Sequence, residues 1–105
     1  MAFGKVIAAA RKAKLLSQKD LAARLMKDDG KPISPQYLND IEHDRRNPPS
    51  EDLLRQIAVL LDLDVEYLCF LAGQLPSDIR DIAVDQGQVR EAFKAFRRSL
   101  GDDHH

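Results

Sequence analysis

Residues 33–50 read ISPQYLNDIEHDRRNPPS, and this stretch decides the fold. Ser34 can cap a helix because its hydroxyl oxygen accepts a backbone N–H, and Pro35 suits the first helical position, where no donor is needed. Leu38 and Ile41 lie three residues apart and would face a core. A Pro-Pro pair then prevents the helix from continuing. We therefore expect a short helix over residues 34–42 that ends in a basic loop.

The outward face of that helix carries polar side chains of the kind that contact DNA. These side chains are Gln36, Tyr37, Asn39 and Asp40, and two arginines follow in the loop. An amide can bond adenine in the major groove, and a carboxylate can accept from cytosine. An ordinary solvated helix face explains the same residues, so the helix alone does not decide between the two interpretations.

Size and composition exclude several classes of protein. The chain has 105 residues, of which 44% are hydrophobic, and this suits one domain with a short extension. No apolar run approaches the ~18 residues of a membrane span, and the amino terminus lacks a signal-peptide pattern. The single cysteine, Cys69, allows neither a disulfide nor a thiolate metal site within one chain. These features favour a cytoplasmic protein without membrane contact, bound metal or cofactor.

The charge is distributed unevenly along the chain. The net charge is −1, but residues 1–50 carry ten Lys and Arg against six Asp and Glu, which gives +4. Residues 51–105 carry six against eleven, which gives −5. Because attraction to phosphate depends on local charge, the amino-terminal half is the expected contact surface for a nucleic acid.

Apolar residues recur at helical spacing along the chain, and no strand-like alternation is present. Ser17, Ser50 and Asp64 are suited to cap helices in addition to Ser34. A polar turn with Gly30 and Pro32 should separate the second helix from the third. We therefore predict an all-α protein with helices over about residues 3–13, 17–27, 34–42, 50–61 and 64–72.

Residues 74–105 form an extension with one or two further helices. Residues 77–84 could make a short helix, and residues 88–100 a longer one after an interruption at Gly87, with a loose end from about residue 101. An apolar stripe on the longer helix consists of Val89, Phe93, Phe96 and Leu100. The stripe either packs on its own domain or contacts a second copy or another protein, and the two phenylalanines favour the contact. The basic opposite face could also touch flanking DNA.

Several separated segments occur together in one known order. They are Arg11, Leu16-Ser17-Gln18, Leu21-Ala22, residues 34–42, Arg45-Arg46-Asn47-Pro48 and residues 53–64. With these segments the chain resembles the Cro/phage-repressor (Xre-like) helix-turn-helix family over roughly residues 3–73. The resemblance implies a five-helix DNA-binding domain over residues 1–73, followed by the helical extension.

The resemblance also assigns roles to individual residues. The helix at 34–42 would be the recognition helix, which enters the major groove with its amino-terminal end towards the bases. Gln36 and Asp40 match base-contacting positions, with Tyr37 and Asn39 beside them. Arg11 and Glu42 match positions that form an internal ion pair. Phosphate contacts would come from Gln18, Ser34, His43, Arg45, Arg46 and Asn47, although His43 could equally interact with the end of its own helix.

Two features depart from the family pattern. About six extra residues separate Leu25 from Ser34, and they either lengthen the second helix or form a bulging loop. Asp44 stands where a glycine is common, and an aspartate tolerates a left-handed backbone better than most residues. The first departure affects the angle at which the recognition helix docks.

The resulting expectation is a transcriptional regulator that represses by binding a near-palindromic double-stranded operator as a homodimer. The alternative is an antitoxin or another partner-binding regulator, which autoregulates its operon and holds a toxin or a regulatory peptidase through the extension. An enzyme is not expected, because the chain has no nucleophile–base arrangement, Gly-rich phosphate loop or metal-ligand pattern.

Overall fold

The computed structural model describes residues 3–82 and 84–101, and these residues confirm the all-α prediction. They contain seven helices and one isolated antiparallel bridge between Met26 and Pro32. The helices are α1 (Phe3–Ala13), α2 (Gln18–Ala22), α3 (Pro35–Glu42), α4 (Glu51–Leu61), α5 (Val65–Leu71), α6 (Ser77–Arg80) and α7 (Gln86–Ser99). In this part of the chain, none of the helices has the length and apolar character that crossing a membrane requires.

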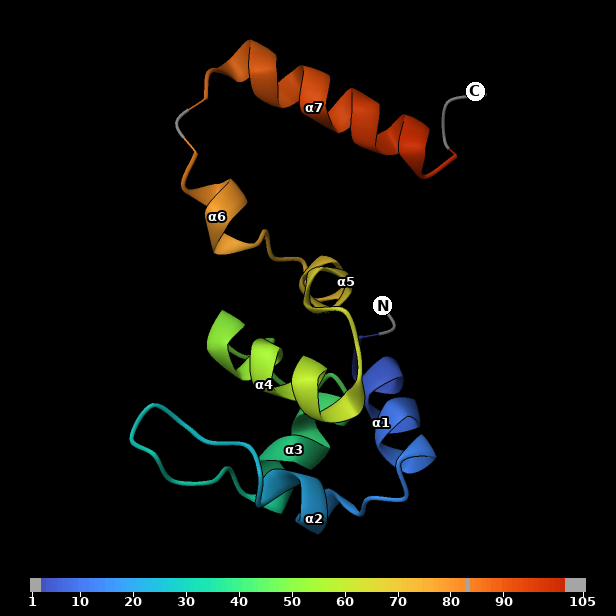
Figure 1. Cartoon of the computed structure of the whole chain (residues 1–105), viewed down its shortest axis with the longest axis vertical. Coiled ribbons are helices and arrows are strands. Elements are labelled where there is room, and N and C mark those ends of the chain that lie inside the picture. The colour runs from blue at the N-terminus through green and yellow to red at the C-terminus, as the bar shows by residue number, and fades with distance from the viewer. Residues whose placement is uncertain (1–2, 83, 102–105) are drawn as a thin grey trace.

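Helices α1 to α5 surround one apolar core. Figure 1 shows α1, α3 and α4 packed together, with α2 at one end and α5 at the other. Ile7, Leu21, Leu38, Ile57 and Leu68 are almost completely buried, so each of these five helices contributes to the core. Helices α6 and α7 extend beyond α5, and α7 lies across the end of the molecule furthest from α2 (Figure 1).

The four predicted caps are confirmed. The hydroxyl oxygens of Ser17, Ser34 and Ser50 each accept the backbone N–H three residues later, at 2.9, 3.0 and 3.3 Å. Asp64 accepts from the backbone N–H of Glu66 at 2.8 Å. Each bond satisfies a donor that the first helical turn would otherwise leave unpaired, and each fixes the residue at which a helix starts.

The expected end of the second helix near residue 27 is wrong, because α2 stops at Ala22. The additional residues form a bulging loop, which we call the arm and define as residues 26–32. The cause lies outside the segment: the side-chain amide of Gln56 on α4 accepts from Met26 N at 2.8 Å and donates to Met26 O at 2.9 Å. These bonds occupy both backbone groups that a longer α2 would have used.

The extension also differs from the prediction in detail. The short helix ends at Arg80 rather than near Val84, and α7 starts at Gln86, so Gly87 lies inside the helix instead of interrupting it. Asp85 and Gln88 form a reciprocal capping box that starts α7 ahead of the glycine. Apart from Gly101, the expected loose end falls on residues 102–105, which lie outside the described residues.

Candidate nucleic-acid interface

A buried ion pair between α1 and α3 lies behind the polar face of α3 and fixes the position of that helix. Arg11 Nε lies 2.6 Å from Glu42 Oε2, and Arg11 Nη2 lies 3.0 Å from Glu42 Oε1. Arg11 Nη1 donates to the Leu16 carbonyl at 2.8 Å. The hydrogen bond to Glu42 raises the pKa of Arg11 above its ordinary value, although burial opposes this shift. The pair fixes α3 against α1 and against the loop that leads into α2.

Gln18, the first residue of α2, connects this ion pair to the outer face of α3. Its Nε2 donates to Glu42 Oε1 at 2.9 Å and to Asn39 Oδ1 at 3.1 Å. The oxygen of the Asn39 amide is therefore occupied, and the two N–H donors of that amide remain for an external acceptor. Both Gln18 and Asn39 are half-buried. The sequence did not predict their partnership, because 21 positions separate the two residues.

Gln36 and Asp40 form a second pair on the same face. Gln36 Nε2 donates to Asp40 Oδ1 at 3.0 Å, and Arg45 Nη1 lies 3.8 Å from the same oxygen. The arginine offsets the negative charge of Asp40, which would otherwise repel a phosphate. Gln36 keeps its carbonyl oxygen and one N–H, and these are the two groups that bidentate contact with adenine requires.

Arg46 stacks on α3. Its guanidinium carbon lies 4.4 Å from the centre of the Tyr37 ring, within the range of a cation–π interaction. Stacking occupies the face of the guanidinium and leaves its N–H edge for hydrogen bonds. Arg46 and Tyr37 therefore act as one unit beside Gln36.

The remaining residues predicted to contact phosphates differ in whether their side chains already have hydrogen-bond partners within the protein. The Ser34 hydroxyl accepts from Tyr37 N as a helix cap. His43 Nδ1 lies 2.8 Å from the Asn39 carbonyl, so this ring contacts the end of its own helix. Asn47 is exposed in the loop. Asp44 has φ +56°, and its Oδ1 accepts from Gly4 N at 3.1 Å, which ties the loop after α3 to the start of α1.

Gly4 allows α1 to approach α3 closely. A Cβ atom at this position would lie 2.3 Å from the Glu42 carbonyl oxygen and 2.7 Å from that of Ile41. Both oxygens are backbone atoms and cannot move aside without displacing α3. The sequence alone does not single out Gly4, which lies in a helix where alanine is ordinarily favoured.

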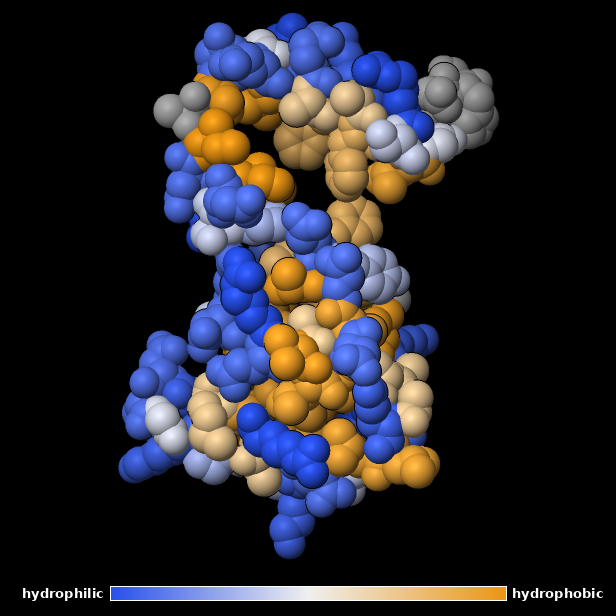
Figure 2. All heavy atoms as spheres, in the orientation of Figure 1, coloured by the Kyte–Doolittle hydropathy of each residue, from blue (hydrophilic) through white to orange (hydrophobic). Residues whose placement is uncertain are grey.

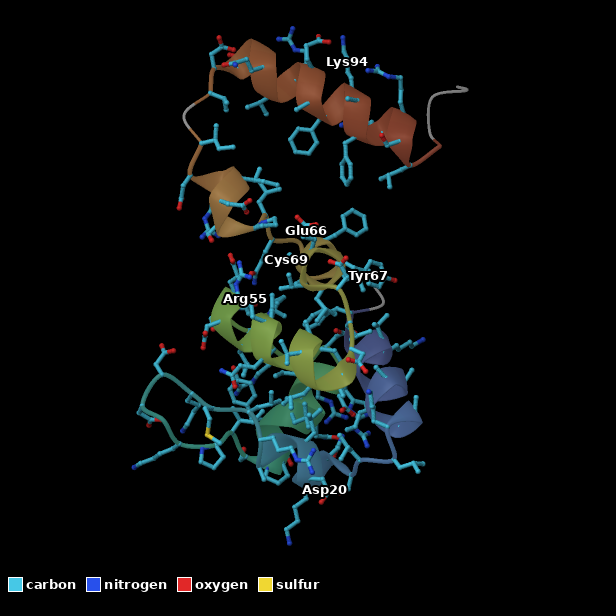
Figure 3. The ribbon with its side chains drawn as sticks, viewed as in Figure 1. Asp20, Arg55, Glu66, Tyr67, Cys69 and Lys94 are labelled. Atoms are coloured by element: carbon cyan, nitrogen blue, oxygen red, sulfur yellow. The ribbon has the colours of Figure 1, made fainter. Side chains whose placement is uncertain are left out.

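A second surface, which we call the apolar groove, lies between α5, α6 and α7. The groove is open to solvent and has a volume of about 860 Å³, and its lining includes Val89, Phe93, Phe96 and Leu100, the four residues of the predicted stripe. Phe70 and Phe96 meet edge to face with ring centres 5.9 Å apart. In Figure 2, apolar side chains of the extension gather on its inner side, around a gap above α5. Figure 3 shows Lys94 on the outer side of α7, pointing away from α5.

Comparisons with known proteins place the chain among helix-turn-helix proteins. The helix-turn-helix family description matches residues 7–68, which is more than half of the chain. A solved complex of SinR protein with SinI protein contains a chain with a TM-score of 0.54 and 27% sequence identity. The similarity covers 92% of this chain and 98% of that one. Among curated proteins there is no match.

The matched region runs from α1 to α5 and includes the ion pair, α2 and the polar face of α3. The solved structure extends the similarity over most of the remaining chain. The described residues thus have the five-helix fold, with its helices in the order that the sequence resemblance to the helix-turn-helix family implied. The chain belongs to the Cro/phage-repressor-like (Xre-like) helix-turn-helix family of DNA-binding transcriptional regulators.

Proposed function

We propose that this protein is a sequence-specific transcriptional repressor that binds a near-palindromic operator as a homodimer. The observation that carries the proposal is the pre-set polar face of α3. Gln18 orients Asn39, and Asp40 lies between Gln36 and Arg45. Side chains that are already held in place lose less conformational entropy when they contact DNA.

Base contacts would come from the residues that still offer free groups on this face. Asn39 presents N–H donors, which suit an acceptor on DNA, and Gln36 presents the carbonyl and the N–H that adenine requires. Tyr37 lies beside them under Arg46. Asp40 has its charge offset by Arg45 and would accept from a cytosine amine. The chemistry of the free groups supports a sequence-selective contact rather than a purely electrostatic one.

Phosphate contacts would surround this face. Arg45 and Arg46 are exposed just after α3, and Ser34, His43 and Asn47 lie at the helix ends and in the loop nearby. Both side-chain N–H groups of Gln18 already bond Glu42 and Asn39, so Gln18 would contribute its backbone N–H at the start of α2. Contacts to phosphates set register and orientation, whereas contacts to base edges select the sequence. We therefore assign the two arginines to affinity and salt dependence, and the α3 face to specificity.

The apolar groove supports the dimer. Thirteen large apolar side chains are exposed among the described residues, and ten of them line the groove. Monomeric proteins rarely expose such contiguous apolar surface, and a larger patch commonly marks a protein contact. Pairing α7 with a second copy would cover Phe93 and Phe96. It would also supply a second recognition helix for a half-site about 34 Å away.

A second candidate function uses the same groove for a different protein. The similar solved structure is a complex of SinR protein with SinI protein, and the similarity reaches into the extension. An antitoxin or another partner-binding regulator would cover the groove with a toxin or a regulatory peptidase instead of a second copy. The candidates differ in what copurifies with the protein when it is expressed with its neighbouring genes.

Selection from a randomised duplex library would supply the operator, and gel-shift titration on the selected duplex tests the assignment. Gln36→Ala should cost about 1–3 kcal/mol of discrimination at one base position. Arg45→Ala should weaken binding to all sequences and flatten the salt dependence. Unchanged affinity in both variants would contradict the proposed interface.

A further inference from the structure

The arm between α2 and α3 is an ordered hairpin. Lys27 N donates to the Lys31 carbonyl at 2.8 Å, and Ile33 N donates to the Leu25 carbonyl at 2.9 Å. Gly30, with φ +79°, occupies the left-handed position of a three-residue loop, and its N–H bonds Lys27 O at 2.9 Å. The segment has the pairing and the turn chemistry of a hairpin rather than those of a loose connection.

The hairpin is fixed to the domain at its base. Leu25 and Ile33 are buried in the core, and Gln56 holds both backbone groups of Met26. The chain leaves the hairpin at Ile33 and caps α3 with Ser34 in the next position. The arm therefore has a set position beside the amino-terminal end of the recognition helix. Figure 1 shows it projecting from the end of the molecule that contains α2 and α3, far from α7.

The arm holds two positive charges side by side. Lys27 and Lys31 are opposite each other in the ladder, so their side chains extend from the same face of the hairpin. Like charges in this position destabilise a strand pair. Both lysines are exposed, and within residues 3–82 and 84–101 neither forms an ion pair with a carboxylate. An anion between the two ammonium groups would remove the repulsion.

The arm has no net charge, but its positive and negative side chains lie at different places along it. Asp28 and Asp29 occupy the tip, and Asp29 Oδ1 accepts from Lys31 N at 2.9 Å. The lysines lie two residues beyond the buried Leu25–Ile33 pair, roughly 7 Å along the strands. The positive part of the arm is thus its base, close to α3, and a bound anion would lie next to the recognition helix.

We propose that Lys27 and Lys31 bind one backbone phosphate of the DNA just outside the base pairs contacted by α3. This inference rests on the DNA-binding function proposed above. DNA is the anion that the position of the arm favours, because the arm ends at the helix that would enter the major groove. The contact would add affinity and fix the docking angle without reading sequence.

The test compares salt dependence and phosphate interference on a duplex that carries the sequence selected by the wild-type protein. In Lys27→Ala/Lys31→Ala, the slope of log K against log salt should fall in magnitude by about 0.9, as expected for one phosphate. Ethylation interference at one flanking phosphate per half-site should disappear, while the selected base sequence stays the same. Lys27→Arg/Lys31→Arg should retain both signals.

Arg90→Ala/Lys94→Ala is the matched control, since it removes two exposed positive charges from α7. Lys94 lies on the outer side of α7 (Figure 3), and Arg90, four residues earlier, shares that side of the helix. The control should keep the wild-type slope and interference pattern. The inference is overturned if the arm variant behaves like the wild type, or if the control loses as much as the arm variant. In both cases the wild-type protein still selects a sequence and the proposed function stands. A wild-type protein that selects no sequence would overturn both proposals.

Discussion

Gln18 and Asn39 are joined by a hydrogen bond of 3.1 Å between Nε2 and Oδ1, and the same nitrogen lies 2.9 Å from Glu42 Oε1. The bond links a buried ion pair to a side chain on the candidate DNA-contacting face. It also determines which end of the Asn39 amide faces outwards. The contact of Gln18 with Glu42 and Asn39 thereby determines that Asn39 presents N–H donors, rather than its oxygen, on the outer face of α3.

The first prediction concerns this orientation. Gln18→Ala frees the Asn39 amide to rotate, so the preference at one base position per half-site should weaken while the rest of the selected motif is retained. Asn39→Ala should affect the same position. Because both variants interrupt one interaction, the double variant should add little to either single change. Library selection with the three variants measures this, and effects at different positions would contradict the proposed coupling.

The second prediction concerns the buried ion pair. Arg11→Met leaves Glu42 without its partner in a buried site, which should cost about 3–5 kcal/mol of unfolding free energy. Arg11→Met/Glu42→Leu removes both charges and should recover much of that loss. Urea denaturation followed by circular dichroism gives the three values. A single variant as stable as the wild type would show that the pair contributes nothing to the fold.

The third prediction uses two glycines at the starts of helices. Gly4→Ala places a Cβ atom 2.3 Å from a backbone oxygen of Glu42 and should destabilise the domain by about 1–3 kcal/mol. Gly87→Ala is the matched control, because its Cβ would meet only Asp85 Oδ1 at 3.5 Å. The control should be neutral or slightly stabilising, since alanine favours a helix. Equal effects of the two changes on thermal unfolding would contradict the close α1–α3 contact.

The fourth prediction concerns the attachment of α6. Glu51 accepts from Ser77 N at 2.9 Å and Ser77 Oγ at 3.1 Å, and it pairs with Arg55. The hydrogen bond from Arg55, supported by those from Ser77, lowers the pKa of Glu51. A lowered folded-state pKa means that the contribution to stability is present above the ordinary carboxylate pKa and is lost as pH falls through the lowered value.

The Ser77 amide signal in NMR spectra should therefore titrate at a pH below the ordinary glutamate range. In Glu51→Gln this titration should be absent, and hydrogen exchange at residues 77–80 should be faster. A Ser77 amide that titrates equally in both proteins would show that Glu51 does not hold α6.

The fifth prediction addresses the apolar groove. Phe93→Asp places a charge on the lining of the groove and should convert a dimer to a monomer in sedimentation experiments. Operator affinity should fall with it, because each half-site would then be bound alone. Lys94→Ala, on the outer side of α7, should leave the mass and the affinity unchanged. A Phe93→Asp protein that remains dimeric would place the dimer contact elsewhere.

Local chemistry explains what could be predicted from the sequence. Ser17, Ser34, Ser50 and Asp64 bond within three residues of themselves, so a helix start is visible in a short window. The end of α2 could not be predicted in this way. It depends on Gln56, which lies 30 positions from Met26 and bonds its backbone. The close approach of Gly4 to Glu42 depends likewise on residues far apart in the chain.

In the candidate site, too, local features could be predicted from the sequence, whereas contacts between residues far apart in the chain could not. The resemblance indicated which positions of α3 point outwards, because helical spacing and family order are both visible in sequence. The sequence did not indicate that Gln18 bonds Asn39, that Arg45 offsets Asp40, or that Arg46 lies over Tyr37. These pairings depend on how α2, α3 and the following loop pack, and they decide which donors and acceptors remain free.

The proposed function requires that α3 selects a DNA sequence and that two copies of the chain bind it together. Binding-site selection from a randomised duplex library with the purified full chain tests it most directly. We expect one enriched motif with two-fold symmetry, whose half-sites are centred about one helical turn, roughly 34 Å, apart. Recovery of no enriched sequence would contradict the claim that α3 reads bases. An enriched motif without symmetry would contradict the paired arrangement.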